Sequence, residues 1–461
     1  MKKCDVLYIH STRNPIGKDD MKFAIMPMGI IGILNNFKSK NIDVIGINYA
    51  IEKTVDSSFE ILDLLNNIEY KILMTDLHWY EHSFGSMYVA EQSKKAKPDI
   101  PVIIGGYTST IFAQEIMQNF DCVDFIVTGD SDLPTEILVE RLLGRTNTEL
   151  KKIPNIWYRE DGIKCSEETW VQTDLDSIDF INTDFFEHEE HVPYLSTSGT
   201  KRVKSGRWIC IARGCLYNCA YCCGANDNME ALFRRCNVLT RSPEKVANDF
   251  FELESNGIWH VSPSHDFQMF GKKYYKPLFE EIRKKNIKPG LYLECFQLPS
   301  KDFIDEIEKT FDRKRTILVI SPISGNEKLR HENGKTFSNE AFYKSVDYII
   351  AKGIAIQIYY TINPVGETKE QYEDTCFQMT YLRQFYGLTN KNIFYQRVVL
   401  DPLAGMRKWN DIGAKYNTFM DYYSYCKDTT VNCAPTGYND IGEVPNVTKR
   451  KMYNDLFGIK E

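Results

Sequence analysis

The sequence lacks several features that would assign it to a particular class of protein. It has no run of about 18 apolar residues, so we expect no membrane-spanning helix. Its first residues lack the apolar segment and small-residue cleavage site of a secretory signal peptide. It has no basic excess, because 56 Lys and Arg stand against 63 Asp and Glu and give a net charge of -7. This balance argues against a broad nucleic-acid-binding surface. Because the sequence lacks both a signal peptide and a membrane span, we expect a cytoplasmic protein.

Paired cysteine knuckles of the kind that hold structural zinc are also missing, although the chain contains 13 cysteines. Their number is odd and they are spread over 461 residues, which excludes a small secreted scaffold held by disulfides. With 43% apolar and 13% aromatic residues, the chain has the material for large buried cores. Its length predicts two or three domains.

Three of the cysteines stand close together, directly after the apolar run 208–212. Cys215, Cys219 and Cys222 have a C-x3-C-x2-C spacing. Iron–sulfur clusters normally use four thiolates, so three would leave one iron without a protein ligand. Such an open position is what a substrate or cofactor needs. The alternative is a structural zinc site or free thiols, for which three more cysteines lie nearby: Cys210, Cys223 and Cys236.

Residues 4 to about 145 alternate short apolar runs with amphipathic segments. Five runs are expected to be strands separated by helices: 4–9, 43–49, 71–77, 101–104 and 124–128. The alternation predicts a Rossmann-like, doubly wound parallel sheet with right-handed crossovers. In such sheets ligands bind at the carboxyl ends of the strands. The pair Gly105-Gly106 at one of these ends permits close approach of a ligand, and it is also common in ordinary turns.

Residues 146–200 have a different character. The segment 153–162 predicts a small hairpin, and an acidic, aromatic connector follows at 173–192. In this connector His188 and His191 stand among carboxylates, an arrangement that also suits a metal ion. A solvated, charged linker is the preferred interpretation.

From Arg207 the alternation of strands and helices resumes and runs through six units. The expected strands are 207–213, 258–264, 290–297, 315–321, 354–361 and 393–400. Six units are too few to close an eight-stranded barrel, but they resemble the open, partial (β/α)6 barrel of the TIM type found in a known enzyme family, which implies chemistry at the carboxyl ends of the strands. Residues 403–461 are rich in aromatic side chains and are expected to form a small helical cap over the barrel mouth.

The cysteine loop, with Tyr221 before its last cysteine and a position after the first of six strands, resembles the signature of radical S-adenosylmethionine (SAM) enzymes. The resemblance implies that Cys215, Cys219 and Cys222 hold a four-iron, four-sulfur (4Fe-4S) cluster. In that family the open iron binds SAM, and an electron from the cluster cleaves it to a 5′-deoxyadenosyl radical. The resemblance also implies an external electron donor such as flavodoxin or ferredoxin.

Further segments of the second half resemble parts of the same family. The turn Ser321-x-x-Ser324-Gly325 resembles the one that holds the methionine end of SAM, although Ile323 stands where an acidic residue is usual. The expected SAM contacts are Tyr221, Glu294, Ser321, Ser324 and Gly325. Residues 364–368 resemble a Pro-Gly-Glu-Thr segment with one insertion, in which Thr368 suits a helix cap. Arg241 matches another recurring segment and equally suits a helix start.

The order of segments in the first third resembles the cobalamin-binding domain that precedes many radical SAM cores. The expected cobalamin contacts are Met28, Gly29, His78, Trp79, Gly105, Gly106, Tyr107, Thr108, Gly129 and Asp130. Other cobalamin domains use a D-x-H-x-x-G motif whose histidine ligates cobalt. Here Asp76-x-His78 is present, but Glu81 stands in place of the glycine, and the histidine follows a different strand. We therefore expect no histidine ligand to cobalt.

Together these resemblances imply a cobalamin-dependent radical SAM enzyme with four parts: a cobalamin-binding domain (1–146), a hairpin and linker (147–200), a radical SAM partial barrel (201–402) and a C-terminal cap (403–461). We expect the deoxyadenosyl radical to abstract a hydrogen from an unactivated carbon of a small molecule or peptide, which methylcobalamin then methylates. The alternatives are a cyclase or rearranging enzyme with the same cofactors, and a cobalamin carrier or sensor with a structural zinc loop. No catalytic acid or base is assigned.

Overall fold

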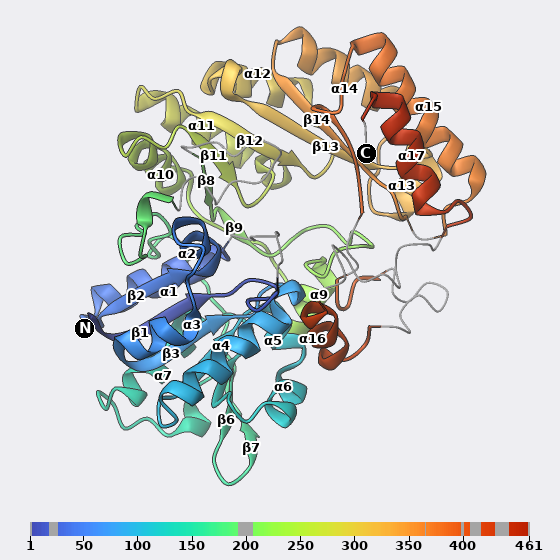
Figure 1. Ribbon diagram of the computed structural model, residues 1–461. Helices are drawn as coiled ribbons and strands as arrows, with labels where there is room; N and C mark the ends of the chain where they lie inside the picture. The colour runs from blue at the N-terminus through green and yellow to red at the C-terminus, as the bar shows by residue number, and fades with distance from the viewer. Residues whose placement is uncertain are drawn as a thin grey trace. The chain divides into compact units, whose positions relative to one another are not determined.

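The computed structural model describes residues 2–17, 26–191, 206–364, 366–397, 401–405, 416–428 and 442–459 (Figure 1). The chain divides into two compact units. The first consists of Met1–Ser198, Asn228–Leu239 and Tyr416–Asn432, and the second of Gly199–Asp227, Thr240–Lys415 and Cys433–Glu461. Within the described ranges, no helix combines the length and the apolar character needed to cross a membrane, as expected.

The first unit is built on a seven-stranded sheet with the order β2-β1-β3-β4-β5-β6-β7. The strands are β1 (Lys2–His10), β2 (Val44–Asn48), β3 (Ile68–Asp76), β4 (Val102–Gly105), β5 (Phe125–Val127), β6 (Ile156–Arg159) and β7 (Ile163–Cys165). The first five are parallel, which confirms the predicted doubly wound sheet. β6 and β7 form the predicted hairpin, and it extends the sheet as an antiparallel edge.

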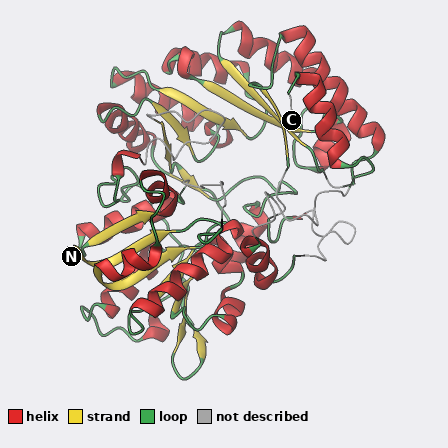
Figure 2. Cartoon of the chain, viewed as in Figure 1, coloured by secondary structure: helices red, strands yellow, loops and turns green. Residues whose placement is uncertain are grey.

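Helices cover both faces of this sheet (Figure 2). They are α1 (Met28–Ser39), α2 (Tyr49–Val55), α3 (Ile61–Asn67), α4 (Ser83–Ala96), α5 (Tyr107–Ile111), α6 (Ala113–Asn119) and α7 (Asp132–Leu142). Along β1, Val6 and Tyr8 belong to the core under α1 and α7, whereas Leu7 and Ile9 belong to the opposite core under α3, α4 and α6. The strand reads as one apolar run because both of its faces are buried.

The second unit contains an all-parallel, six-stranded sheet with the order β15-β14-β13-β12-β11-β8. Its strands are β8 (Gly206–Ile209), β11 (His260–Pro263), β12 (Gly290–Cys295), β13 (Ile317–Ile323), β14 (Ala355–Thr361) and β15 (Ile393–Gln396). All six predicted strands are therefore confirmed. Neighbours in sequence are neighbours in the sheet, as expected for repeated strand–helix units.

Amphipathic helices connect these strands. They are α10 (Pro243–Ser255), α11 (Lys272–Lys284), α12 (Lys301–Thr310), α13 (Glu327–Glu332), α14 (Asn339–Ala351) and α15 (Lys369–Tyr386). In α12, Phe303, Ile304 and Ile307 are fully buried while the charged residues between them face outward. This helical spacing is what the sequence predicted. A short pair, β9 (Ala212–Arg213) and β10 (Leu239–Thr240), follows β8.

The C-terminal residues do not form the single cap expected at 403–461. Helix α16 (Phe419–Lys427) belongs to the first unit, and α17 (Asn446–Phe457) belongs to the second. α16 packs into the first unit through its apolar face. This face carries Phe419, Tyr422 and Cys426, which have no exposed surface. The short helix α9 (Asn226–Phe233) likewise leads from the second unit into the first.

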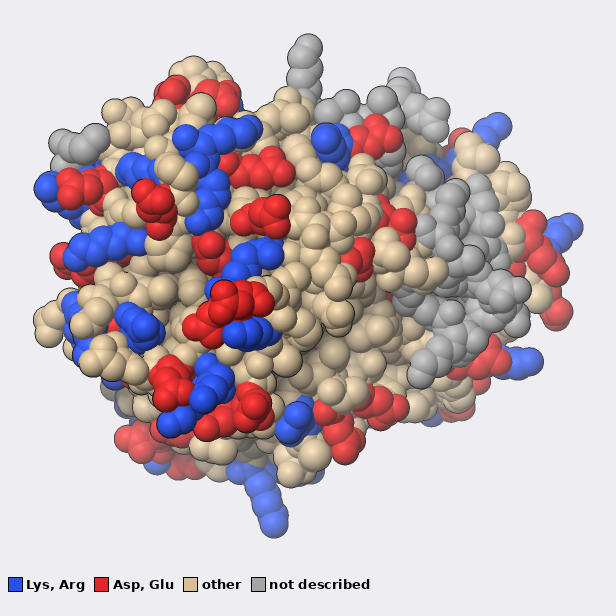
Figure 3. All heavy atoms as spheres, turned by 90° about the horizontal axis from the view of Figure 1, so that it is seen from below, with Lys and Arg blue, Asp and Glu red and all other residues tan. Residues whose placement is uncertain are grey.

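The face of the molecule shown in Figure 3 carries acidic and basic side chains side by side. No continuous basic patch covers the described residues on that face.

Candidate functional site

The three thiols of the cysteine loop are half-buried and follow β9 in the second unit. The backbone N–H of Tyr217 donates to Cys215 Sγ over 3.4 Å, and that of Cys222 donates to the Cys219 carbonyl over 3.2 Å. Burial, with help from the Asp401 carboxylate, raises the pKa of the Cys222 thiol to about 12. Without a metal this thiol is protonated at neutral pH, so metal binding must release a proton.

A chain of hydrogen bonds from the end of β11 holds the backbone that leads into this loop. Ser264 Oγ accepts from the Ile211 N–H over 3.1 Å, and its hydroxyl lies 2.8 Å from His265 Nδ1. His265 Nε2 lies 2.9 Å from the Gly214 carbonyl oxygen. A carbonyl only accepts, so Nε2 carries the proton and Nδ1 accepts from Ser264. Burial lowers the pKa of His265 to about 4, consistent with this neutral tautomer.

The segment between α13 and α14 lies against Cys219. Gly334 has a φ of +90°, and a Cβ placed on it would lie 3.0 Å from Cys219 Cα and 3.4 Å from its Sγ. The next residue, Lys335, is buried and donates to the Phe296 carbonyl over 2.7 Å. Burial lowers the pKa of the Lys335 ammonium, while Cys219 and Asp266 act in the opposite direction. The loop therefore has a buried cation beside one of its thiols.

Glu294 is the only exposed residue of β12. Protein nevertheless surrounds its carboxyl group, and this burial raises its pKa. Glu294 therefore carries an accessible side chain at the carboxyl end of β12, where a bound molecule can meet it. Tyr221 is similarly enclosed, and burial next to Cys219 and Cys222 raises the pKa of its hydroxyl.

The turn expected to hold SAM forms hydrogen bonds with other side chains of the same unit. The Ser324 hydroxyl is fully buried and pairs with Thr375 Oγ1 at 3.0 Å, and the Gly325 N–H donates to the same atom at 2.9 Å. The guanidinium of Arg330 donates to the carbonyls of Ser324 and Gly325. Ser321, by contrast, is half-buried on β13, before a bulge in which Ile323 has a φ of +69°.

Within the segment that resembles Pro-Gly-Glu-Thr, Glu367 is held by α17. Glu367 forms a buried ion pair with Lys449, which also donates to the Ile362 carbonyl over 3.0 Å. Thr368 caps α15 in a capping box with Gln371, so its predicted role as a helix cap is confirmed.

Arg241 is fully buried at the start of α10. Its guanidinium donates to the Cys210 carbonyl over 3.0 Å and pairs with Asp249, and its N–H donates to the Ile211 carbonyl. The residue thus ties α10 to the backbone that leads into the cysteine loop. This contact gives Arg241 a positioning role behind the thiols.

In the first unit, the loops after β3 and β4 are joined at the carboxyl edge of the sheet. Gly106 has a φ of +125°, and a Cβ there would lie 2.6 Å from the Leu77 carbonyl carbon. The Thr108 N–H and hydroxyl both donate to the His78 carbonyl, over 3.2 and 2.9 Å. Glycine is required at 106 by conformation and by space. Gly105, Gly106 and Thr108 are thus brought together with His78.

Aromatic rings gather around this junction. The ring of His78 lies 4.8 Å from Trp79 and 6.2 Å from Tyr107, and Tyr107 lies 4.9 Å from Phe233 of α9. Burial lowers the pKa of His78 to about 4, so its imidazole is neutral at physiological pH. The cluster offers flat, apolar surface at the edge where ligands of such sheets bind.

The remaining predicted cobalamin residues differ in their surroundings. Gly129 lines a cavity of about 250 Å³ together with Trp157, Trp170 and Phe233. The Asp130 carboxylate is buried in an ion pair with Arg235, so its charge is already compensated within the protein. Met28 and Gly29 form the first turn of α1.

Two further groups of residues have side chains of the types that ligate metals. His188 and His191 lie 3.7 Å from carboxylates of Glu52 and Glu190 and are partly exposed, which fits a solvated, charged linker. Cys426 is buried against the Tyr80 carbonyl in the first unit, and Cys433 lies outside the described residues.

Sequence reasoning did not single out Gly334, Lys335 or His265 as parts of this site. The pair Asn333-Gly334 is a recognisable turn signal, but nothing local shows that the turn reaches Cys219. A lone lysine or histidine carries no motif. Their roles arise from contacts with residues that are distant in the sequence. His265 and Gly214, for example, are more than 50 positions apart.

Comparisons with known proteins agree with the fold described above. No protein-family model and no curated protein matches the sequence. The radical SAM methyltransferase TsrM from Kitasatospora setae, solved with cobalamin and a 4Fe-4S cluster, matches with a TM-score of 0.63 and 16% identity, over 88% of this chain and 74% of TsrM. A second TsrM structure holds tryptophan substrate and a SAM analogue, with 15% identity.

The cobalamin-dependent SAM radical enzyme OxsB, solved with aqua-cobalamin, matches with a TM-score of 0.59 and 12% identity. The match covers 99% of this chain and 62% of OxsB. The chain therefore has the fold of cobalamin-dependent radical SAM enzymes over most of its length, which confirms the resemblance inferred from the sequence.

Proposed function

We propose that this chain is a cobalamin-dependent radical SAM enzyme that methylates an unactivated carbon of a small-molecule or peptide substrate. The observation that carries the proposal is the three-thiol loop, which follows the first strand of a six-stranded parallel sheet. The doubly wound sheet in the same chain and the fold shared with TsrM and OxsB support the pairing of the two cofactors.

The donor set of the loop suits an iron–sulfur cluster. Cys215, Cys219 and Cys222 would hold a 4Fe-4S cluster and leave one iron open for SAM. When bound, the cluster and SAM supply radical chemistry and cobalamin supplies a methyl group. Lys335 places a positive charge beside Cys219 and offsets the charge that thiolates bring into a buried site. Glu294 carries its accessible side chain at the carboxyl end of β12, where a cationic group of a bound molecule would meet it.

The fit to cobalamin rests on the carboxyl edge of the first sheet. Gly106 lets the loops after β3 and β4 pack together at this edge, and His78, Trp79 and Tyr107 would pack against the ring. These residues position the ring and exclude water. An external electron donor of the flavodoxin or ferredoxin type completes the proposal.

The proposal is tested without knowledge of the substrate. The chain is reconstituted anaerobically with iron, sulfide and cobalamin, and then given SAM and a chemical reductant. We expect 5′-deoxyadenosine and S-adenosylhomocysteine, the second from methyl transfer out of SAM. Cys219→Ala abolishes deoxyadenosine formation, whereas Cys236→Ala, at an exposed thiol outside the C-x3-C-x2-C set, retains it.

Two results would contradict the proposal in different ways. Deoxyadenosine without S-adenosylhomocysteine would favour a cyclase or rearranging enzyme over a methyltransferase. Zinc that is bound in place of iron and is lost in Cys219→Ala would overturn the enzymatic function and leave a cobalamin carrier or sensor with a structural zinc loop.

A further inference from the structure

The first sheet has a topological switch point between β1 and β3. The two strands are parallel neighbours, and the chain after β1 leads to α1 on one face while the chain after β3 leads to α4 on the other. The crevice at such a switch point is the usual ligand-binding position in open α/β sheets. The last residue of β1 is His10 and the last residue of β3 is Asp76.

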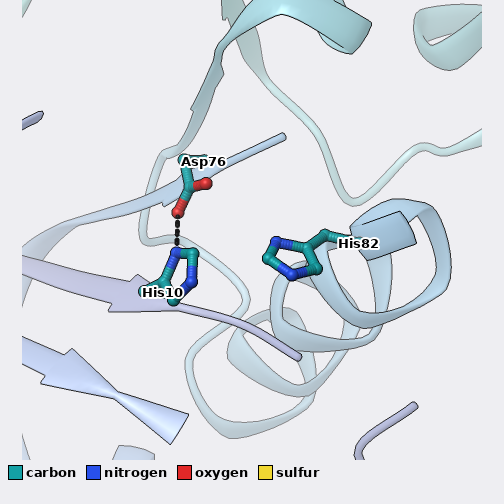
Figure 4. Close-up of side chains that lie close together, drawn as sticks. All are labelled: His10, Asp76 and His82. Carbon is teal, nitrogen blue, oxygen red and sulfur yellow. Dashed lines mark hydrogen bonds and ion pairs between the residues drawn. The ribbon is translucent and has the colours of Figure 1, made fainter. Parts of the chain in front are cut away.

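A third polar side chain closes this position. His82, at the end of the short 3-10 helix η1 (Tyr80–His82), lies with its ring centroid 5.0 Å from that of His10 (Figure 4). His10 Nδ1 lies 2.8 Å from Asp76 Oδ1, and one ligand atom from each of the three residues falls within 4.8 Å of the others. Figure 4 shows the three side chains converging from β1, β3 and η1.

The cluster is sealed from solvent. His10 and His82 have no exposed surface, and Asp76 retains only 5%. A closed polar space of this kind has no entrance for an organic ligand, and it suits a single ion. The three residues are also distinct from the predicted cobalamin contacts.

Hydrogen bonding within the cluster is incomplete. Tyr8 donates to Asp76 Oδ1 over 2.6 Å, so two groups already share that oxygen. Asp76 Oδ2 and His10 Nε2 are buried and have no hydrogen-bond partner among the described residues. Leaving a buried polar atom unsatisfied costs free energy, and an unlocated ion is a recognised explanation.

We propose that His10, Asp76 and His82 bind one divalent transition-metal ion, of which zinc fits best. Two imidazole nitrogens and one carboxylate form a donor set that zinc accepts in proteins. Tyr8, bonded to the carboxylate, acts as the outer partner that orients a ligand. The ion joins the ends of β1 and β3 to η1, and it thereby fixes the loop that carries His78 and Trp79.

The test measures metals in the full chain, reconstituted with iron–sulfur cluster and cobalamin, dialysed against buffer with zinc and then against metal-free buffer. We expect about one zinc per chain, in addition to iron and cobalt. Asp76→Asn and His82→Gln each lose this zinc. Tyr8→Phe, which keeps all three ligands, weakens zinc binding by roughly 10–100-fold, the usual effect of losing an outer partner.

Two controls locate the ion. His260→Gln removes a buried histidine of the second unit and retains the zinc. Cys219→Ala also retains it, because the thiols lie elsewhere. The proposal is overturned if the wild-type chain holds no zinc and its melting temperature is unchanged by added zinc. It is equally overturned if the zinc survives Asp76→Asn and His82→Gln, or is lost in Cys219→Ala.

Discussion

At the scale of single residues, the cysteine loop depends on neighbours that are not ligands. Gly334 gives Cys219 the space it occupies, His265 holds the Gly214 carbonyl, and Lys335 brings a charge close to the thiol. Such outer contacts orient metal ligands and set the charge around them. Substitutions here should affect the cluster before they affect the fold.

Replacing Gly334 with alanine tests the close approach. The new Cβ would lie 3.0 Å from Cys219 Cα, so we expect the Cys219 thiol to be displaced and the iron content after reconstitution to fall. Gly387→Ala is the matched control, since Gly387 also has a positive φ but its Cβ meets nothing within 4 Å. Both variants carry backbone strain of about 1–2 kcal/mol. Equal iron contents in the two variants would show that space at 334 is not needed.

The buried carboxyl group of Asp266 should make the unfolding free energy depend on pH. Burial raises its pKa to about 6, whereas the ordinary value is 3.8. The folded state therefore binds this proton more tightly than the unfolded state does. The stabilisation is complete below about pH 4 and is lost as the pH rises through 6, by about 3 kcal/mol.

The measurement is urea unfolding at several pH values, comparing the wild type with Asp266→Asn. The difference in unfolding free energy between the two should change by about 3 kcal/mol between pH 4 and pH 7. A flat difference for Asp266→Asn would contradict the raised pKa.

At the scale of elements, α17 is attached to the loop before α15 by one buried ion pair. The side chains of Lys449 and Glu367 each keep only 1% of their surface exposed. Burial raises the pKa of Glu367, and Lys449 counteracts this rise. Removing one partner of such a pair leaves the other charge buried without compensation.

We expect Lys449→Met to lower the unfolding free energy by about 3–5 kcal/mol. Adding Glu367→Gln to Lys449→Met should recover part of this loss, because no buried charge then remains. Lys369→Met removes an exposed pair with Glu373 and should change stability by less than about 1 kcal/mol. A small effect of Lys449→Met, similar to that of Lys369→Met, would mean that the pair does not hold α17.

At the scale of the whole molecule, the two units are interleaved along the chain. The first unit takes its sheet from the beginning of the sequence but completes its core with residues 228–239 and 416–432. From the last of these, Phe419 and Tyr422 are fully buried, and the carboxylate of Glu115 accepts from the N–H groups of Phe419 and Met420 at the start of α16.

A fragment that ends at residue 198 should therefore be less stable than the same unit in the full chain. Each buried aromatic of α16 contributes roughly 1.5–3 kcal/mol, so the loss should amount to several kcal/mol. Thermal unfolding followed by circular dichroism measures the difference. A synthetic peptide with residues 416–428 should raise the melting temperature of the fragment, and a scrambled peptide should not. A fragment that melts like the full chain would show that α16 is dispensable.

The sequence predicted those features that local spacing determines. The strands of both sheets follow from apolar runs, and the Cys215–Cys222 loop follows from thiol spacing. The sequence did not predict the pairing of His10 with Asp76 or the packing of α16 in the first unit, because both join residues far apart in the chain. The prediction of Ser324 as a SAM contact did not consider Thr375, 51 residues away. The Thr375 hydroxyl is hydrogen-bonded to the Ser324 hydroxyl.

The interleaving also bears on how the protein is made in the cell. When the ribosome has produced the first sheet, the helix α16 that packs against α4 and η1 is still roughly 250 residues away, which at 5–20 residues per second means a delay of about 10–50 s. During that time the surface under α16 is exposed, and most of the second unit emerges before the first is finished. Because the first unit needs residues 416–432 and the second needs residues 433–461, neither unit is complete until these late segments are made. Chaperones that hold nascent chains should therefore bind both units.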